Sequence, residues 1–260
     1  MVLLALALGG AAGALAAAPS VLPPALEPAG NGGLPALDSA LAKLSTHRRL
    51  LVVAAHPDDE DGAALVAVAH GMGGEAAYLS LSRGAGGQNL IGEEKGAGLG
   101  LLRSEELLAA RRLDGARQYF ARAHDFGYTR SLDETLGRWP RAALLADTLR
   151  VVARFRPQVI VTVFPDDGRG GHGQHQAAGW VAAEAFRRSR EARGPDGWRE
   201  AAPAGAARWE VASLWRSGGF AREAAAALVP LGTLAPWSGR SLYQLAGAAR
   251  SQHRSQDMGR

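Results

Sequence analysis

The chain contains no cysteine, and among its 29 basic residues only Lys43 and Lys95 are lysines. The lack of cysteine excludes disulfide bonds, thiolate zinc sites and cysteine nucleophiles. Any metal that the protein binds must therefore be held by histidine and carboxylate side chains.

The chain also has little net charge. The net charge is only +4, and the arginines are spread over the whole chain between aspartates and glutamates. The densest basic stretch, Arg187 to Arg193, contains no aromatic residue and falls where a helix is expected to end. A nucleic-acid surface combines clustered basic residues with stacking side chains, so we predict no nucleic-acid partner.

Long apolar runs are absent except at the N-terminus. Residues 1–18 carry no charge and are almost entirely Ala, Leu, Val and Gly. They are predicted to be a signal peptide of a periplasmic or secreted protein; the alternatives are an uncleaved anchor or a leader, and the protein is cytoplasmic if no signal is present. Residues 19–37 are predicted to be a linker rich in Pro, Gly and Ala. Residues 38–260 suffice for a single catalytic domain.

Strand and helix patterns alternate along this domain. Strands are predicted at 50–55, 75–81, 125–128, 158–164 and 209–215. Helices are predicted near Asp38, at 62–70, from Ser104 toward Phe120, over 133–155 with a break at Pro140, and from His172 through Phe186. This alternation indicates an α/β fold with a mostly parallel sheet covered on both faces. Ligands bind at the carboxyl ends of the strands in such sheets.

A charged pentapeptide, His56-Pro57-Asp58-Asp59-Glu60, directly follows the first predicted strand. Its carboxylates would repel one another unless a positive charge lay among them, and a divalent metal is the simplest such charge. The alternative is that an aspartate caps the next helix while His56 is an ordinary loop histidine. The pentapeptide alone leaves both interpretations open.

A second polar cluster follows the strand at 158–164. Its loop carries Asp166 and Asp167, and His172 and His175 then lie three residues apart at the start of a helix, on one face. Ligands of His, Asp and His type with an open position suit a catalytic zinc. The remaining carboxylate and histidine can move protons, so the two clusters together predict metal-assisted hydrolysis.

Together the two motifs resemble those of the PIG-L/LmbE family of zinc-dependent N-acetylglucosamine deacetylases. The resemblance runs from about Arg49 to the C-terminus and includes the 82–89 loop, the 103–117 helix and the 251–256 segment. It implies a Rossmann-like three-layer fold, with the ligand site at the carboxyl ends of the strands. It also implies one zinc ion per chain, for which another divalent metal is the alternative.

The resemblance assigns roles to individual residues. His56, Asp59 and His175 match the metal ligands. Asp58 matches the general base, and His172 matches the histidine that, as imidazolium, stabilises the tetrahedral intermediate or protonates the leaving amine. Glu60 is expected to support the site from behind.

Arg83, after the second strand, matches an arginine that binds substrate in relatives; the alternative is a surface arginine in a loop. Three positions depart from the family pattern, namely Ala85, Gly170 and Gln174. At Gln174 many relatives have an aspartate, so a carboxylate behind the metal site is either missing or supplied by Asp166 or Asp167. His253 recurs in relatives but is interpreted as a surface histidine.

We therefore predict a hydrolase that removes N-acetyl groups from an N-acetylglucosamine-type sugar or glycoconjugate. The alternatives are an amidase acting on a larger amide conjugate and a non-catalytic carbohydrate-binding domain. The presence of both Asp58 and His172 argues against binding alone, because binding needs neither a base nor an acid.

Overall fold

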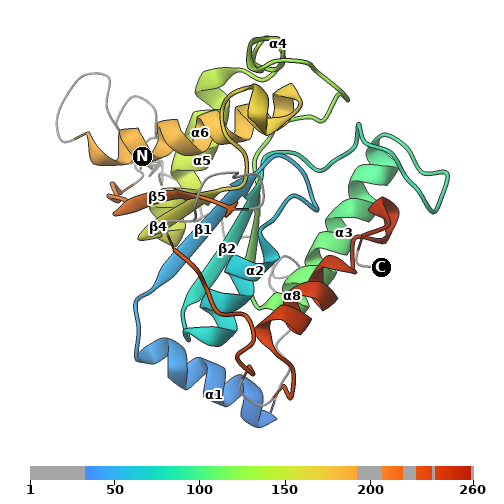
Figure 1. The fold of residues 1–260 in the computed structure, drawn as a ribbon. Helices are drawn as coiled ribbons and strands as arrows, with labels where there is room; N and C mark the ends of the chain where they lie inside the picture. The colour runs from blue at the N-terminus through green and yellow to red at the C-terminus, as the bar shows by residue number, and fades with distance from the viewer. Residues whose placement is uncertain (1–32, 192–206, 219–226, 236–237, 259–260) are drawn as a thin grey trace, which may run out of the picture.

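The computed structural model describes residues 33–191, 207–218, 227–235 and 238–258. Five parallel strands form one sheet in the order β3-β2-β1-β4-β5 (Figure 1). The strands are β1 (Arg49–Ala54), β2 (Glu75–Ser80), β3 (Arg117–Phe120), β4 (Val159–Thr162) and β5 (Ser213–Arg216). The predicted α/β fold with a parallel sheet is confirmed.

Helices cover both faces of the sheet. One face carries α4 (Leu132–Leu136), α5 (Arg141–Phe155) and α6 (Gly173–Arg190). The other face carries α2 (Gly62–Val66), its π-helical continuation η2 (Ala67–Gly71), α3 (Ala97–Asp114) and α8 (Leu242–Arg250). Three further elements are α1 (Gly33–Leu44), which precedes β1, and the short turns η3 (Gly168–Gly170) and η5 (Arg254–Gln256). The result is a three-layer arrangement, as predicted.

The apolar character of β1 follows from its central position. Leu51 and Val53 pack with α5 and α6, whereas Val52 and Ala54 pack with α2 and α3 on the opposite face. Successive strand residues point to opposite faces, and both faces are buried here, so an uninterrupted apolar run is required.

Helix α3 ends earlier than predicted. Gly115 adopts a φ of 73° and its N–H donates to the carbonyl of Arg111, which closes the helix at Asp114. The residues that follow form β3, so the strand predicted at 125–128 is wrong and that segment is a loop. The predicted break at Pro140 is confirmed, since this residue caps the N-terminus of α5.

The structure describes only part of the N-terminal segment to which the predictions apply. Helix α1 begins at Gly33, inside the segment predicted to be a linker. The predicted signal peptide and the rest of that linker lie outside the described residues. Among the helices that the structure describes, none combines the length and apolar character needed to cross a bilayer.

The order of the strands determines where the two motifs meet. From β1 the chain moves to β2 and β3 on one side, and later to β4 and β5 on the other. Such a reversal opens a crevice at the carboxyl ends of the two central strands. The pentapeptide follows β1, and His172 and His175 follow β4, so both motifs lie at this crevice.

Candidate active site

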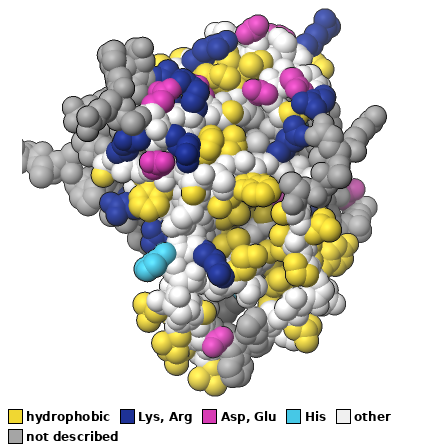
Figure 2. Space-filling view, turned by 60° about the vertical axis from the view of Figure 1, so that its left-hand side comes forward, with side chains coloured by type: hydrophobic (Ala, Val, Ile, Leu, Met, Phe, Trp, Pro, Cys, Tyr) yellow, Lys and Arg dark blue, Asp and Glu magenta, His cyan; other side chains and the backbone are white. Residues whose placement is uncertain are grey.

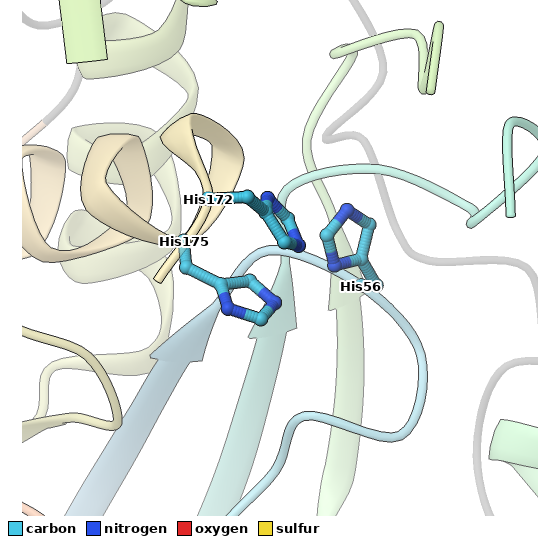
Figure 3. A group of neighbouring side chains, drawn as sticks. All are labelled: His56, His172 and His175. Carbon is cyan, nitrogen blue, oxygen red and sulfur yellow. The ribbon is translucent and has the colours of Figure 1, made fainter. Parts of the chain in front are cut away.

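Three imidazole rings gather at the carboxyl ends of β1 and β4 (Figure 3). His56, from the loop after β1, and His172 and His175, at the start of α6, each offer a ring nitrogen within 4.8 Å of the others. The ring of Phe164 stacks on His175 with centroids 3.7 Å apart. The fold thus unites the two motifs in one cluster.

The carboxylate of Asp59 lies between two of these rings. Its Oδ2 is 3.0 Å from His56 Nδ1, and its Oδ1 is 3.4 Å from His175 Nε2. Burial raises the pKa of Asp59, but the two histidines outweigh this effect and hold the pKa well below its usual range. Burial lowers the pKa of His56, while the carboxylates of Asp59 and Asp125 raise it to about 9. The charges of Asp59 and His56 therefore stabilise each other.

The outer nitrogen of each histidine that contacts Asp59 faces an oxygen that only accepts hydrogen bonds. His56 Nε2 lies 2.6 Å from Gln174 Oε1, and His175 Nδ1 lies 3.2 Å from the carbonyl oxygen of Gly170. With a proton on each outer nitrogen, displacement of the inner proton by a metal would leave the inner nitrogen's lone pair directed toward Asp59. Ligands about 2.1 Å from a tetrahedral zinc lie roughly 3.4 Å from one another. The distances from Asp59 to His56 and to His175, 3.0 and 3.4 Å, are close to this spacing, and the ring nitrogens of His56, His172 and His175 form a second group that could hold a metal.

A carboxylate lies behind the site, but not the one predicted. Gln174 Nε2 donates to Asp125 Oδ1 at 3.2 Å and to the carbonyl of Gly127 at 2.6 Å, which fixes its Oε1 toward His56. Asp166 and Asp167 are exposed, and Asp167 pairs with Arg169. The prediction that either of them supplies this charge is therefore wrong. Sequence reasoning missed Asp125 because it assigned that segment to a strand.

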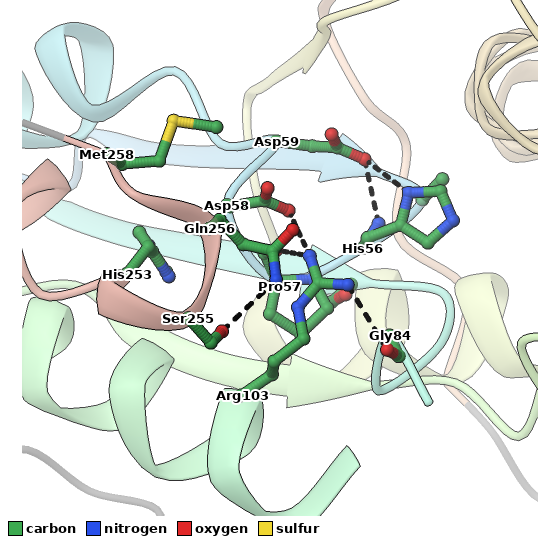
Figure 4. Close-up of polar contacts among 12 residues, drawn as sticks. His56, Pro57, Asp58, Asp59, Gly84, Arg103, His253, Ser255, Gln256 and Met258 are labelled. Atoms are coloured by element: carbon green, nitrogen blue, oxygen red, sulfur yellow. Dashed lines mark hydrogen bonds and ion pairs between the residues drawn. The ribbon is translucent and has the colours of Figure 1, made fainter. Parts of the chain in front are cut away.

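Asp58 has a strained backbone that its neighbours hold in place (Figure 4). Its φ is 101°, in the region that favours glycine. Arg103 Nη2 donates at 2.6 Å both to Asp58 Oδ1 and to the carbonyl of Pro57, and the N–H of Asp58 donates to Glu60 Oε2 at 3.0 Å. Burial and the neighbouring Asp59 raise the pKa of Asp58 to about 6, although Arg103 lowers it. Asp58 is thus a carboxylate of fixed orientation whose pKa is raised toward neutrality.

Arg103 is a site residue that sequence reasoning placed on a helix but not in the site. It is only 4% exposed, and it shares a buried face of α3 with Leu99 and Leu107, which are spaced four residues to either side. A charged residue within such an apolar stripe is rarely buried without a partner. An arginine at this position in an apolar helix face therefore indicates a buried partner, and this pattern is visible in the sequence.

Glu60 supports the pentapeptide from behind, as expected. Its Oε1 lies 3.0 Å from Arg111 Nη2 and 2.7 Å from His253 Nε2. Burial raises the pKa of Glu60, but these two groups lower it far below its usual range. His253 is 1% exposed, so its interpretation as a surface histidine is wrong. Its partner is 193 residues away in sequence, which no local pattern reveals.

Replacing His253 with glutamine is expected to lower stability in a pH-dependent way. Burial lowers the pKa of His253, but Glu60 raises it above its ordinary value of 6.5. A raised folded-state pKa stabilises the protein below pH 6.5, and this stability is lost as the pH rises through the folded-state value. Urea unfolding should therefore show a loss of about 1–3 kcal/mol near pH 6 that shrinks toward pH 9. The exposed His47→Gln serves as control, and a pH-independent loss in His253→Gln would contradict the ion pair.

His172 is the third ring of the cluster and has a different environment. Its Nδ1 is buried and has no hydrogen-bond partner among the described residues. Burial and the two neighbouring histidines lower its pKa to about 4, so His172 is neutral at pH 7. The predicted role as an imidazolium therefore requires a negative charge that arises beside it.

The guanidinium of Arg83 contacts the protein itself. It lies 4.1 Å from the centroid of the Phe120 ring, and its Nη1 donates to Ser104 Oγ at 3.0 Å. A cavity of about 510 Å³ opens beside Asp58, Asp59 and His175, and Arg83 does not line it. Substrate binding by Arg83 stays a prediction.

A comparison with protein-family models decides the family. Residues 51–186, more than half of the chain, match the model PIG-L, described as GlcNAc-PI de-N-acetylase. The chain belongs to the PIG-L family. The matched segment begins within β1 and ends within α6, so it contains both PIG-L motifs. A search of curated protein sequences finds no match.

The chain is also similar to several solved structures. The N,N'-diacetylchitobiose deacetylase from Pyrococcus horikoshii is 18% identical, with 82% of this chain and 72% of that chain covered and a TM-score of 0.56. The A40926 pseudoaglycone deacetylase Dbv21 is 18% identical, covering 80% and 82%, with a TM-score of 0.48. GalB, the 4-carboxy-2-hydroxymuconate hydratase from Pseudomonas putida KT2440, is 25% identical, covering 64% of each chain, with a TM-score of 0.44. The diacetylchitobiose deacetylase, with the TM-score of 0.56, shows that this chain has a similar fold.

Proposed function

We propose that this PIG-L protein is a zinc-dependent hydrolase that removes the N-acetyl group from an N-acetylglucosamine-type sugar or glycoconjugate. The observation that carries the proposal is the contact of Asp59 with both His56 and His175, in a cavity that Asp58 also lines. Its support is the tautomer that Gln174 and Gly170 impose on the two histidines, together with family membership.

The proposed reaction divides the work among three groups. Zinc held by His56, Asp59 and His175 would lower the pKa of a water and polarise the amide carbonyl. Asp58, oriented by Arg103, accepts a proton from the attacking water. Negative charge that develops on the former carbonyl oxygen raises the pKa of the neighbouring His172. His172 then takes up a proton from solvent, stabilises that charge as an imidazolium and donates the proton to the departing amine, while Asp58 releases to solvent the proton that it accepted from water.

An acetate-release assay tests the proposal. The substrates are N-acetylglucosamine, chito-oligosaccharides and N-acetylglucosaminyl conjugates, each with added zinc and with chelator. We expect acetate from at least one of them with zinc and none with chelator. Release of a larger acid in place of acetate would indicate the amidase, and glycan binding without release would indicate a non-catalytic domain; either result overturns the deacetylase.

Gln174 gives a separate test of the proposed metal site. Replacing it with leucine removes the acceptor that fixes His56 Nε2, and loss of such a partner lowers metal affinity about 10–100-fold. Zinc affinity is measured by competition with a chromogenic chelator, with circular dichroism to check the fold. The neighbouring Gln176, whose amide contacts Leu132 and Gly171 instead of His56, provides the matched Gln176→Leu control. Unchanged affinity in Gln174→Leu would show that His56 is not a ligand.

We also propose that the protein is exported, on the basis of its apolar N-terminal residues 1–18. Fractionation of cells that produce the full chain, with mass spectrometry of the mature N-terminus, tests this proposal. An intact N-terminus in the cytoplasmic fraction would contradict it.

A further inference from the structure

The cavity beside the proposed metal site has two chemically different walls. One wall consists of the pentapeptide loop, the start of α2 and His175, and it carries the acidic groups. The other wall consists of α8 and the segments before and after it, and most of its side chains are apolar: Leu231, Tyr243, Ala246, Ala249 and Met258. Val163 and Phe164, which follow β4, add to the apolar lining. The cavity therefore extends well beyond Asp58, Asp59 and His175.

Some of the acidic groups in this lining already have partners within the protein. Glu60 is paired with Arg111 and His253. Asp61 accepts hydrogen bonds from the backbone N–H of Ala64 at 3.0 Å and from Ser217 Oγ at 2.7 Å. The other acidic groups of the lining are Asp58 and Asp59, where the amide is proposed to react.

Helix α8 presents one face to the cavity. Tyr243, Ala246, Gly247 and Arg250 line it, and their spacing of three and four residues places them on the same side of the helix. Leu242 and Leu245 are buried on the opposite side, where α8 packs against α2 and α3. A Cβ atom added at Gly247 would meet nothing within 4 Å. The cavity is therefore unfilled next to the small residues Ala246 and Gly247 at the centre of this helix face.

Exposed apolar groups also gather on one side of the molecule. Figure 2 views the side on which β5 forms the edge of the sheet, and hydrophobic side chains are grouped there. Among the residues that line the cavity, Tyr243 is 69% exposed. The apolar wall of the cavity is therefore open to solvent at Tyr243.

We propose that this wall is a subsite for an alkyl or aryl group that the substrate carries beside its N-acetylated amino sugar. The inference rests on the proposed function and specifies its substrate class. Hydroxyl groups of a second sugar ring that lie against Leu231, Ala246 and Met258 would lose hydrogen bonds to water without replacement, because the side-chain polar groups of this wall are confined to Arg250 and the hydroxyl of Tyr243. An apolar group gains free energy from the same contacts, and the flexible thioether of Met258 can adapt to its shape.

The experiment compares kcat/KM for acetate release from the octyl and the methyl β-glycosides of N-acetylglucosamine, with zinc present. We expect a preference of about tenfold or more for the octyl glycoside over the methyl glycoside.

Gly247→Leu fills the open space of the subsite and should reduce that preference to about twofold or less. Gly98→Leu is the matched control, since Gly98 is an exposed helical glycine of α3 that does not line the cavity. A preference that survives in Gly247→Leu, or that Gly98→Leu also abolishes, would overturn the subsite.

Failure of the subsite and failure of the proposed function give different results. Acetate release from the methyl and octyl glycosides at equal kcat/KM keeps the function and rejects the subsite. If no substrate is turned over, calorimetric titration of the wild-type protein with the two glycosides still decides the subsite. Binding of the octyl glycoside about tenfold more tightly, reduced in Gly247→Leu, supports it, and equal binding rejects it.

Discussion

Asp58→Asn is expected to lower kcat by about 10²–10⁴-fold while the protein keeps its zinc. Asparagine cannot accept a proton from water, but its side-chain oxygen can still accept the hydrogen bond from Arg103. It also tolerates the φ of 101° better than most residues, so the loop should keep its conformation. The measurements are steady-state acetate release and the zinc content of the purified protein.

The control for Asp58→Asn is Asp167→Asn, which removes a carboxylate at the exposed end of the loop after β4. It should leave kcat within about twofold of wild type. An Asp58→Asn enzyme that retains more than about a tenth of the wild-type kcat would show that another group is the base.

His175→Ala is expected to lower zinc affinity by more than about 100-fold and to abolish acetate release. This loss should exceed the effect of any group that only supports a ligand, which is about 10–100-fold. Asp59→Asn should behave similarly, because its carboxylate lies between His56 and His175. Zinc content after dialysis against a weak chelator provides the measurement.

His172→Ala separates two possible ligand sets. The ring nitrogens of His56, His172 and His175 lie within 4.8 Å of one another, so geometry alone also permits a site made of three histidines. If His172 works on the leaving amine, His172→Ala keeps the zinc and loses turnover. Loss of zinc in His172→Ala, with zinc retained in Asp59→Asn, would establish the three-histidine set instead.

The parts of the site that the sequence predicts are those determined by local pattern. An apolar run followed at once by His56 and its carboxylates specifies both a buried strand and the polar edge beyond it. His172 and His175 lie at a helix start that their spacing already indicates. The order of strands then brings these local features together, as expected for a parallel sheet.

The parts that the sequence does not predict depend on contacts between distant segments. Arg103 acts on Asp58 across 45 residues, and Gln174 contacts Asp125 across 49. Neither pairing produces a periodicity or a turn signal near the residues involved. The strand misplaced at 125–128 has a local cause instead, because β3 is only four residues long and begins two residues after the glycine that ends α3.

The central position of β1 links ligand binding to folding. His56 follows β1 and His175 follows β4, and these strands become neighbours only when the two halves of the sheet pair. A ligand that uses both histidines binds the paired sheet and not a chain in which either half is detached. At a concentration 100 times its dissociation constant, such a ligand stabilises the paired state by about 2.7 kcal/mol. Binding of a ligand to both histidines therefore also stabilises the pairing of β1 with β4 at the middle of the sheet.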